Sequence, residues 1–285
     1  MSYQILGFED ERQLVTAFAK RLGVDPVFAL ETQYRAGELT VRMPSITAKD
    51  VLLIANIHEE PRYALRTLFV AKALRHTGVR HCALLAPWIA YGRQDRVPRP
   101  GEVPGGLVVG DMLSRLFDKI VTLDAHSPMF VRAFRRKLVN VWVAPDAAFQ
   151  EQLGQVDVII AADHGAMRRA KTCAASMKLS CVVLEKQRNA DGVKTTLLAK
   201  DIKRISGKHV LIVDDISDTG GTLVSAAVML REHGTESVQA LVSHVPNLAV
   251  LRERVGGVLK VEALHDHATQ TIQECALEAL IDAVS

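Results

Sequence analysis

The chain has 285 residues, of which 48% are hydrophobic and 24% charged, and a chain of this size suits two α/β domains of about 140 residues each better than one. The net charge of +3 is too small to favour a nucleic-acid partner, and no apolar run approaches the roughly 18 residues that a membrane-spanning helix needs. The four cysteines form no C-x-x-C pair and no secretory leader is visible, so we expect reduced thiols in a cytoplasmic protein without a membrane partner.

The first half of the chain alternates between predicted helices and buried strands. Strands are predicted at residues 50–54, 81–87 and 119–124, and helices at residues 9–22, 61–78 and 108–116. In the second of these helices, Leu65, Leu68, Phe69 and Ala73 are expected to face inward. Residues 34–41 indicate a hairpin, because a glycine turn at Gly37 leads into an alternating strand. This β-α-β order indicates a parallel sheet with right-handed crossovers.

A basic loop follows the second of these strands, at residues 86–101. It holds three arginines, and the carboxylates near them in the sequence are those of Asp95 and Glu102. Two interpretations remain open, a solvated basic loop and a polyphosphate site formed by forked guanidinium groups. The next strand ends in Asp124 and His126, which are either structural or ligands of a magnesium ion.

A second α/β series begins near residue 145. Strands are predicted at residues 157–162, 180–188, 210–213 and 236–244, and a helix at residues 270–284, in which Ile272, Ala276, Leu277, Leu280 and Ile281 are expected to face inward. Polar groups again follow the strands, and Lys186 and Arg188 are either a solvated strand end or part of a site, with residues 189–194 behind them as a candidate lid. His265 and His267 flank Asp266, but without a cysteine or third histidine nearby in the sequence we do not expect a zinc site.

The most informative segment is residues 210–222, in which a buried strand ends in Asp214 and Asp215 and a glycine turn opens a helix. The turn offers small residues, hydroxyls and unpaired helical N–H groups, which suit a phosphate. Two acids would repel a bare phosphate, so a sugar diol or a metal ion is the expected partner of the acid pair. Parallel strands place their carboxyl ends at one edge of a sheet, and we therefore expect the polar strand ends to form a site.

The order of these motifs resembles the ribose-phosphate pyrophosphokinase family, and the resemblance covers residues 34 to 245. It rests on Ala-Pro-Trp-Ile-Ala-Tyr-Gly-Arg-Gln-Asp-Arg at 86–96, Asp-Ala-His at 124–126, Asp-x-Gly at 163–165, Lys-x-Arg at 186–188 and Asp-Asp-x-x-Asp-Thr-Gly-Gly-Thr at 214–222. The chain looks closer to the short archaeal-type members than to the longer bacterial and animal ones. The resemblance implies two tandem type I phosphoribosyltransferase-like α/β domains, at residues 1–144 and 145–285, each a mostly parallel sheet flanked by helices.

The same resemblance implies a reaction and a role for each matching residue. The reaction is transfer of the β,γ-pyrophosphoryl group of ATP to the 1-hydroxyl of ribose 5-phosphate, which gives phosphoribosyl pyrophosphate and AMP. The implied catalytic residues are Lys186 and Arg188, the implied magnesium ligands are His126 and Asp163, and the implied cofactor is Mg²⁺. ATP-binding residues would be Tyr34, Gly37, Glu38, Arg93, Gln94, Asp95 and Arg96. Ribose 5-phosphate would bind Arg188, Asp214, Asp215, Asp218, Thr219, Gly220, Gly221 and Thr222.

Two rival functions remain open at this point. A phosphoribosyltransferase would share the Asp214 to Thr222 loop, but it has no use for Arg93 and Gln94. A non-catalytic regulatory relative is the other rival, and it gains support from Ala36, which stands where the family has an acid that recognises adenine. Adenine sites that are shared between subunits in the family imply a homo-oligomer, either a dimer or a multiple of dimers.

Overall fold

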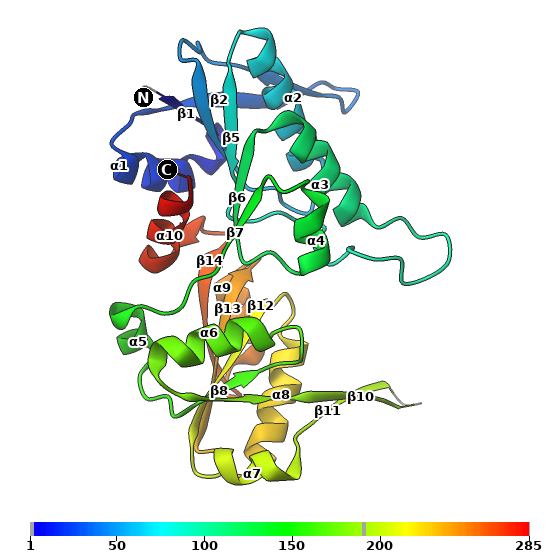
Figure 1. Cartoon of the computed structure of the whole chain (residues 1–285), viewed down its shortest axis with the longest axis vertical. Helices are drawn as coiled ribbons and strands as arrows, with labels where there is room; N and C mark the ends of the chain where they lie inside the picture. Colours follow the sequence, from blue (N-terminus) through cyan, green and yellow to red (C-terminus); the bar gives the residue numbers. More distant parts are fainter. Residues whose placement is uncertain (1–2, 190–191, 285) are drawn as a thin grey trace. The chain divides into compact units, whose positions relative to one another are not determined.

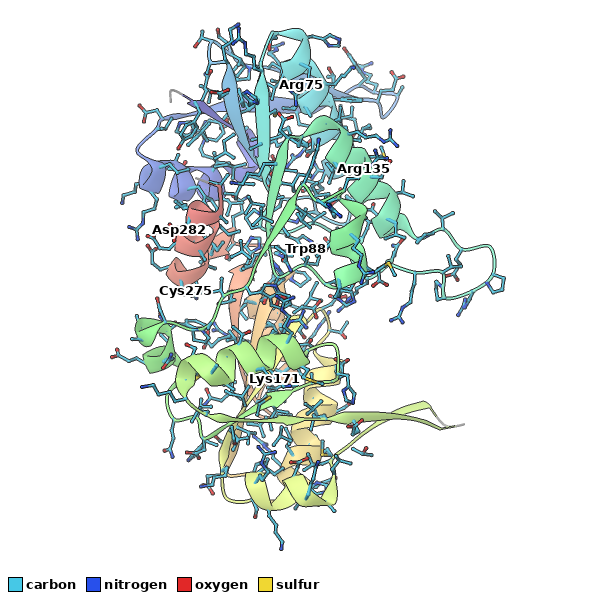
Figure 2. The ribbon with its side chains drawn as sticks, in the orientation of Figure 1. Arg75, Trp88, Arg135, Lys171, Cys275 and Asp282 are labelled. Atoms are coloured by element: carbon cyan, nitrogen blue, oxygen red, sulfur yellow. The ribbon has the colours of Figure 1, made fainter. Side chains whose placement is uncertain are left out.

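The computed structural model describes residues 3–189 and 192–284, with the side chains of residues 186–189 and 192–195 left out. The chain divides into two compact units, one formed by Met1–Val141 with Leu277–Ser285 and the other by Trp142–Ala276. The sequence had suggested a boundary between residues 144 and 145, with the C-terminal residues in the second domain. Helix α10 (Glu274–Val284) crosses this division, and Cys275 and Asp282 lie near its two ends (Figure 2).

The first unit is a seven-stranded sheet with the strand order β3-β2-β1-β4-β5-β6-β7. Its strands are β1 (Tyr3–Phe8), β2 (Pro26–Gln33), β3 (Leu39–Arg42), β4 (Asp50–Ile54), β5 (His81–Leu85), β6 (Lys119–Leu123) and β7 (Leu138–Val141). All neighbours pair in parallel except β2 and β3, which form the predicted hairpin. The short 3-10 helix η1 (Glu9–Glu11) precedes α1 (Arg12–Leu22), which lies on one side of the sheet, while α2 (Pro61–His76), α3 (Gly105–Leu116) and α4 (Pro128–Ala133) lie on the other (Figure 1).

Helix α2 forms where it was predicted, but its inner face was predicted only in part: Leu68 packs against the core, whereas two of the other residues expected there are exposed. Leu65 and Phe69 are 42% and 43% exposed, whereas Arg66 is fully buried. The Arg66 guanidinium donates hydrogen bonds to the carboxylates of Asp10, Glu11 and Glu31 at 2.8 to 2.9 Å. The buried face of the helix therefore carries this ion network together with Val70, Ala71 and Leu74.

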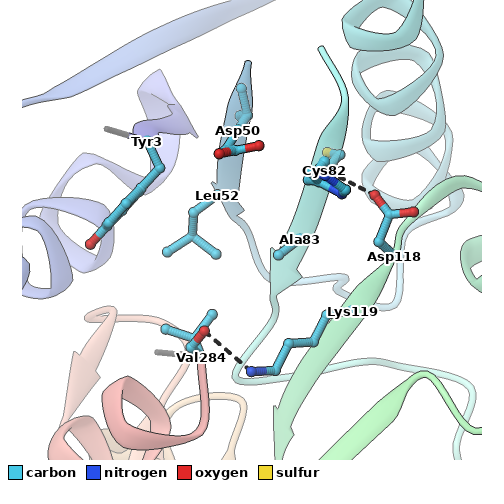
Figure 3. A pocket seen from close by; sticks show the side chains of 10 residues that line it. Tyr3, Asp50, Leu52, Cys82, Ala83, Asp118, Lys119 and Val284 are labelled. Carbon is cyan, nitrogen blue, oxygen red and sulfur yellow. Dashed lines mark hydrogen bonds between the residues drawn. The ribbon is translucent and has the colours of Figure 1, made fainter. Parts of the chain in front are cut away.

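A cavity of about 490 Å³ lies at the amino-terminal edge of the first sheet. Its wall includes Tyr3, Asp50 and Lys119, at the starts of β1, β4 and β6 (Figure 3). The Lys119 ammonium donates a hydrogen bond to the carbonyl of Val284 at 3.2 Å. The polar residues singled out in the sequence follow the other ends of the strands, so this cavity is separate from the candidate site.

The second unit is a six-stranded sheet with the strand order β15-β14-β13-β12-β8-β9, and it confirms the expected α/β class. Its strands are β8 (Val158–Ala161), β9 (Ser180–Val183), β12 (His209–Ile216), β13 (Ser237–Val245), β14 (Lys260–Asp266) and β15 (Thr271–Ile272). All neighbours are parallel except β14 and β15. Ile272, expected on the C-terminal helix, therefore lies on β15, and Ala276, Leu277 and Leu280 of that helix are buried as predicted.

Five helices and a ribbon complete the second unit among the described residues. The helices are α5 (Ala147–Leu153), α6 (Met167–Met177), α7 (Ala199–Ile205), α8 (Gly221–Glu232) and α9 (Leu248–Val255). Strands β10 (Glu185–Asn189) and β11 (Gly192–Thr196) form an antiparallel two-stranded ribbon, so a ribbon stands where the sequence suggested one long strand and a lid. In the described part of the chain, the helices are all too short or too polar to cross a bilayer.

Candidate active site

The loop between β12 and α8 has the form that the sequence predicted, a strand end, a turn and an open helix N-terminus. Gly220 precedes the helix with a φ of +78°, and a Cβ at this position would lie 2.6 Å from Cγ1 of Val255. Glycine is therefore required here both by the backbone conformation and by the contact with α9. Asp218, Thr219 and Thr222 are exposed, so the positive end of the α8 dipole is accessible to an anion.

Asp214 and Asp215 lie at the end of β12, at the start of this loop. Burial and, next, the charge of Asp215 raise the pKa of Asp214 to about 7. Arg169 of α6 approaches both acids, with its Nη1 atom 3.9 Å from Asp214 Oδ1 and 4.0 Å from Asp215 Oδ1. At these distances Arg169 offsets only part of the repulsion, so the acid pair is well suited to accept hydroxyl donors or a cation.

Arg169 itself was not recognised as a site residue from the sequence. It is 7% exposed, and its Nη1 atom also donates to the carbonyl of Gly165 at 3.3 Å. Residues 168–171 hold two arginines and a lysine, and nothing in that run distinguishes the one arginine that turns toward the acids. What distinguishes Arg169 from its neighbours is its position in the first turn of α6, which follows the turn at Asp163.

Asp163 follows β8, the neighbour of β12 in the sheet. The two strands pair in parallel with Ala161 opposite Val213, so the segments that carry Asp163 and Asp214 leave the same edge of the sheet. Asp163 is half-buried, and its Oδ1 atom accepts a hydrogen bond from the backbone N–H of Ala166 at 3.0 Å. The second unit therefore brings these two predicted site residues to one edge.

Lys186 and Arg188 lie on β10 of the ribbon. In the antiparallel register Lys186 pairs with Thr195 and Arg188 pairs with Val193. The side chains of Lys186 and Arg188 lie outside the described part of the structure. Their catalytic roles stay predictions.

The predicted ATP-binding loop meets the predicted metal ligand within the first unit. Ser127, next to His126, donates a hydrogen bond to Asp95 Oδ2 at 2.5 Å, and a Cβ on Gly92 would lie 3.1 Å from the Cβ of His126. Asp95 is only 8% exposed, whereas Arg93, Gln94 and Arg96 are exposed. Asp95 therefore holds the loop against the segment that follows β6, and the exposed side chains remain accessible to a ligand.

The same loop also packs against the start of α3. The backbone N–H of Gly106 donates to the carbonyl of Gln94 at 3.0 Å, and a Cβ on Gly106 would lie 2.4 Å from the carbonyl oxygen of Tyr91. Trp88, in the loop after β5 (Figure 2), donates from its backbone N–H to Asn56 Oδ1 at 2.8 Å. These contacts fix the backbone of the basic loop, and they leave open whether its arginines are only solvated or bind a polyphosphate.

The three remaining predicted ATP-binding residues lie at the tip of the β2–β3 hairpin. Tyr34 is 62% exposed, and Glu38 is also exposed. The Gly37 N–H donates to the Tyr34 carbonyl and the Tyr34 N–H to the Glu38 carbonyl, both at 2.9 Å. The hairpin thus presents an aromatic ring and a carboxylate on a closed turn, with Ala36 between them.

Comparison with known proteins identifies both halves of the chain. Residues 3–116 match the N-terminal domain of ribose phosphate pyrophosphokinase, and residues 147–275 match the phosphoribosyl transferase domain. The ribose-phosphate pyrophosphokinase of Pyrococcus furiosus is 34% identical over 211 residues, which cover 73% of this chain and 74% of that protein. That of Thermococcus kodakarensis is 33% identical over 240 residues, covering 83% of this chain and 82% of the relative.

A solved structure agrees with this assignment at the level of the fold. The phosphoribosylpyrophosphate synthetase of Mycobacterium smegmatis superposes with a TM-score of 0.78 at 20% sequence identity, over 100% of this chain and 98% of that one. The matched domains, the archaeal relatives and the order of the motifs agree with one another. The chain therefore belongs to the ribose-phosphate pyrophosphokinase family.

Proposed function

We propose that this protein transfers the β,γ-pyrophosphoryl group of ATP to the 1-hydroxyl of ribose 5-phosphate, giving phosphoribosyl pyrophosphate and AMP. The observation that carries the proposal is the loop at residues 214–222, where Asp214, with its raised pKa, and Asp215 stand beside an open helix N-terminus. Family membership supports the same reaction, because relatives from two archaea are named ribose-phosphate pyrophosphokinase.

In this proposal the two ends of the loop bind different parts of ribose 5-phosphate. The 5-phosphate accepts hydrogen bonds from the first N–H groups of α8 and from the hydroxyls of Thr219 and Thr222. The ribose hydroxyls donate to Asp214 and Asp215, while Asp218, Gly220 and Gly221 shape the phosphate end. Arg169 lies close enough to the acid pair to offset part of its negative charge. We therefore add Arg169 to the proposed ribose 5-phosphate site.

The transferring group passes through a transition state with negative charge on its non-bridging oxygens. Lys186 and Arg188 are proposed to neutralise this charge as it develops, without a covalent intermediate. The exposed Arg93, Gln94 and Arg96 are proposed to contact ATP, and Asp95 contributes chiefly by holding their loop through Ser127. Tyr34, Gly37 and Glu38 are proposed to contact the adenine bound by a neighbouring copy of the chain.

A homo-oligomer is the assembly that this proposal requires. Four large apolar side chains are 42% to 46% exposed on two helices that pack against each other, namely Leu65 and Phe69 on α2 and Val108 and Met112 on α3. Apolar side chains gathered on a surface often mark an interface. A dimer or a multiple of dimers should therefore be seen by light scattering of the purified protein.

Mg²⁺ is the proposed cofactor, and the oxygen donors of the site suit it. Asp163 and Asp214 offer carboxylates at one sheet edge, and the raised pKa of Asp214 marks negative charge that a cation would relieve. His126 is proposed as a further ligand. A bound Mg²⁺ would supply Lewis-acid stabilisation of the phosphoryl oxygens.

The decisive experiment for the proposed function is a substrate test that also separates the two rivals. Purified protein receives ATP, Mg²⁺ and ribose 5-phosphate, and AMP is measured by chromatography. Formation of AMP that depends on ribose 5-phosphate supports the kinase, and it should fall at least tenfold in Asp214→Asn and in Lys186→Ala. No AMP, together with transfer of the phosphoribosyl group to a base and release of pyrophosphate when phosphoribosyl pyrophosphate is supplied, would indicate a phosphoribosyltransferase. Lack of ATP binding at millimolar concentration would favour the regulatory relative.

A further inference from the structure

Three histidines gather at the carboxyl end of the second sheet, outside the set of residues used above. They are His244 at the end of β13, His265 on β14 and His267 directly after β14. His244 and His265 are completely buried, and His267 is 7% exposed. The potential ligand nitrogens of the three rings all lie within 4.8 Å of one another.

The sheet register explains why these rings meet. His244 pairs with His265 across the parallel strands β13 and β14, and paired residues on neighbouring strands project from the same face. His267 follows two residues later, and residues at i and i+2 of an extended chain also share a face. The backbone N–H of His267 donates to the carbonyl of Val245 at 2.9 Å, which continues the β13–β14 pairing past the end of the strand.

The spacing of the nitrogens suits a tetrahedral metal ion. The Nδ1 atoms of His244 and His265 are 3.3 Å apart. Two imidazole nitrogens bound to zinc, each about 2.0–2.1 Å from the metal, are separated by about 3.3 Å in tetrahedral geometry. Burial also disfavours the charged imidazolium, and neutral imidazole is the form that coordinates a metal.

Asp266 lies between His265 and His267 in the sequence, but its carboxylate accepts hydrogen bonds from other groups. Its Oδ1 atom accepts hydrogen bonds from the N–H groups of Leu248 and Ala268 at 3.2 Å, and its Oδ2 atom accepts one from the Thr269 hydroxyl at 2.9 Å. Asp266 thus fixes the backbone on which His265 and His267 stand, on the opposite side from the rings. The donor set is three imidazoles, with a water molecule as the expected fourth ligand.

We propose that His244, His265 and His267 form a zinc site that ties the end of β13 to the end of β14. The site adjoins the ribose 5-phosphate loop, because the Ser217 N–H donates to the carbonyl of His244 at 3.2 Å. A bound zinc ion would therefore fix the strand ends from which this loop starts. The proposal does not depend on the enzymatic activity, because it rests on the positions of the three rings alone.

Metal analysis of the purified protein tests the zinc site directly. The chain is produced without a histidine tag in zinc-supplemented medium, dialysed against Mg²⁺ buffer, and analysed for zinc by mass spectrometry. About one zinc ion per chain is expected, and it should be lost in both His265→Gln and His267→Gln. The His126→Ala variant should keep its zinc, which excludes binding at the magnesium site, and His76→Ala on the exposed end of α2 serves as a surface control.

Two further measurements keep the test independent of how well the variants fold. The parent protein stripped with a chelator should regain several degrees of melting temperature when zinc alone is added back, because a metal that binds only the folded state stabilises it. Cobalt added in place of zinc should give the visible absorption of a tetrahedral site. A folded parent protein that takes up no zinc, or zinc retained in both histidine variants, would overturn the proposal and leave a cluster of imidazoles that bond to each other.

Discussion

Gly220 and Val255 approach each other so closely that a single methyl group on Gly220 would lie 2.6 Å from Val255 Cγ1. This contact joins the start of α8 to the end of α9 and sets the position of the phosphate loop. The left-handed backbone at Gly220 adds a second reason for glycine. The neighbouring Gly221 differs, since the nearest atom to a Cβ there would be Thr219 Oγ1 at 3.8 Å.

We predict that Gly220→Ala destabilises the protein by about 1–3 kcal/mol through overpacking and backbone strain. Gly221→Ala is the matched variant and should leave the free energy of unfolding within about 0.5 kcal/mol of the parent, while raising the KM for ribose 5-phosphate. Denaturant unfolding and initial-rate kinetics measure the two effects. Equal stability of the two variants would contradict the packing described here.

The raised pKa of Asp214 predicts a stability that falls as pH rises. The ordinary value of 3.8 applies to the unfolded chain, and the folded value is about 7. Between these values the folded state binds more protons than the unfolded state, so the free energy of unfolding decreases with pH. Asp214→Asn removes this penalty and should become increasingly more stable than the parent as pH rises from 4 to 8.

Asp157→Asn provides a control of opposite sign for the pH experiment. The hydrogen bond from the His209 N–H, at 2.9 Å, lowers the pKa of Asp157. Its carboxylate therefore stabilises the fold above its ordinary pKa, and that contribution disappears as pH falls. Thermal melts at several pH values compare the two variants. A stability difference between Asp214→Asn and the parent that stays constant with pH would show that Asp214 has an ordinary pKa.

The buried Arg66 network predicts a large difference between two arginines of the same helix. Arg66→Met leaves the carboxylates of Asp10, Glu11 and Glu31 without their shared cation and should cost about 3–5 kcal/mol. Arg62→Met removes ion pairs from a side chain that is 40% exposed and should cost no more than about 1 kcal/mol. Urea unfolding of both variants checks this contrast, and similar losses would argue against a buried network.

The hairpin tip predicts a change in nucleotide preference. Ala36 lies between Tyr34 and Glu38 in an exposed turn, and a carboxylate there can accept a hydrogen bond from the amino group of adenine. Ala36→Asp should lower the KM for ATP severalfold and leave the KM for GTP unchanged or higher. Ala36→Asn tests whether the charge is needed. Identical ATP and GTP kinetics in the parent and the Asp variant would exclude this segment from base recognition.

The sequence was sufficient to predict the parts of the fold that local pattern determines. Strand β4 and helix α2 begin at the predicted residues. The loop after β12 was predictable because its residue types leave few alternatives. The C-terminal helix was predicted too early, since nothing local separates β15 from α10.

What the sequence missed depends on contacts between distant residues. Arg66 is buried with carboxylates 35 to 56 residues away, so its place on the inner face of α2 could not be predicted from the local pattern. Arg169 approaches the acid pair because β8, which precedes its helix, pairs with β12, and this pairing could not be derived from the sequence. The cluster of three histidines was not expected because β14 was not predicted, so the register that pairs His244 with His265 could not be derived from the sequence.

The central claim is the transfer of a pyrophosphoryl group to the anomeric hydroxyl of ribose 5-phosphate. Phosphorus-31 NMR of a reaction with ATP, Mg²⁺ and ribose 5-phosphate tests it most directly. We predict that the ATP resonances give way to AMP and to a diphosphate attached to carbon 1 of the sugar, and that Lys186→Ala slows this conversion by on the order of a thousandfold. Lys194→Ala, on the neighbouring strand of the ribbon, should react at nearly the parent rate. Release of ADP, or of free pyrophosphate without a sugar diphosphate, would contradict the account.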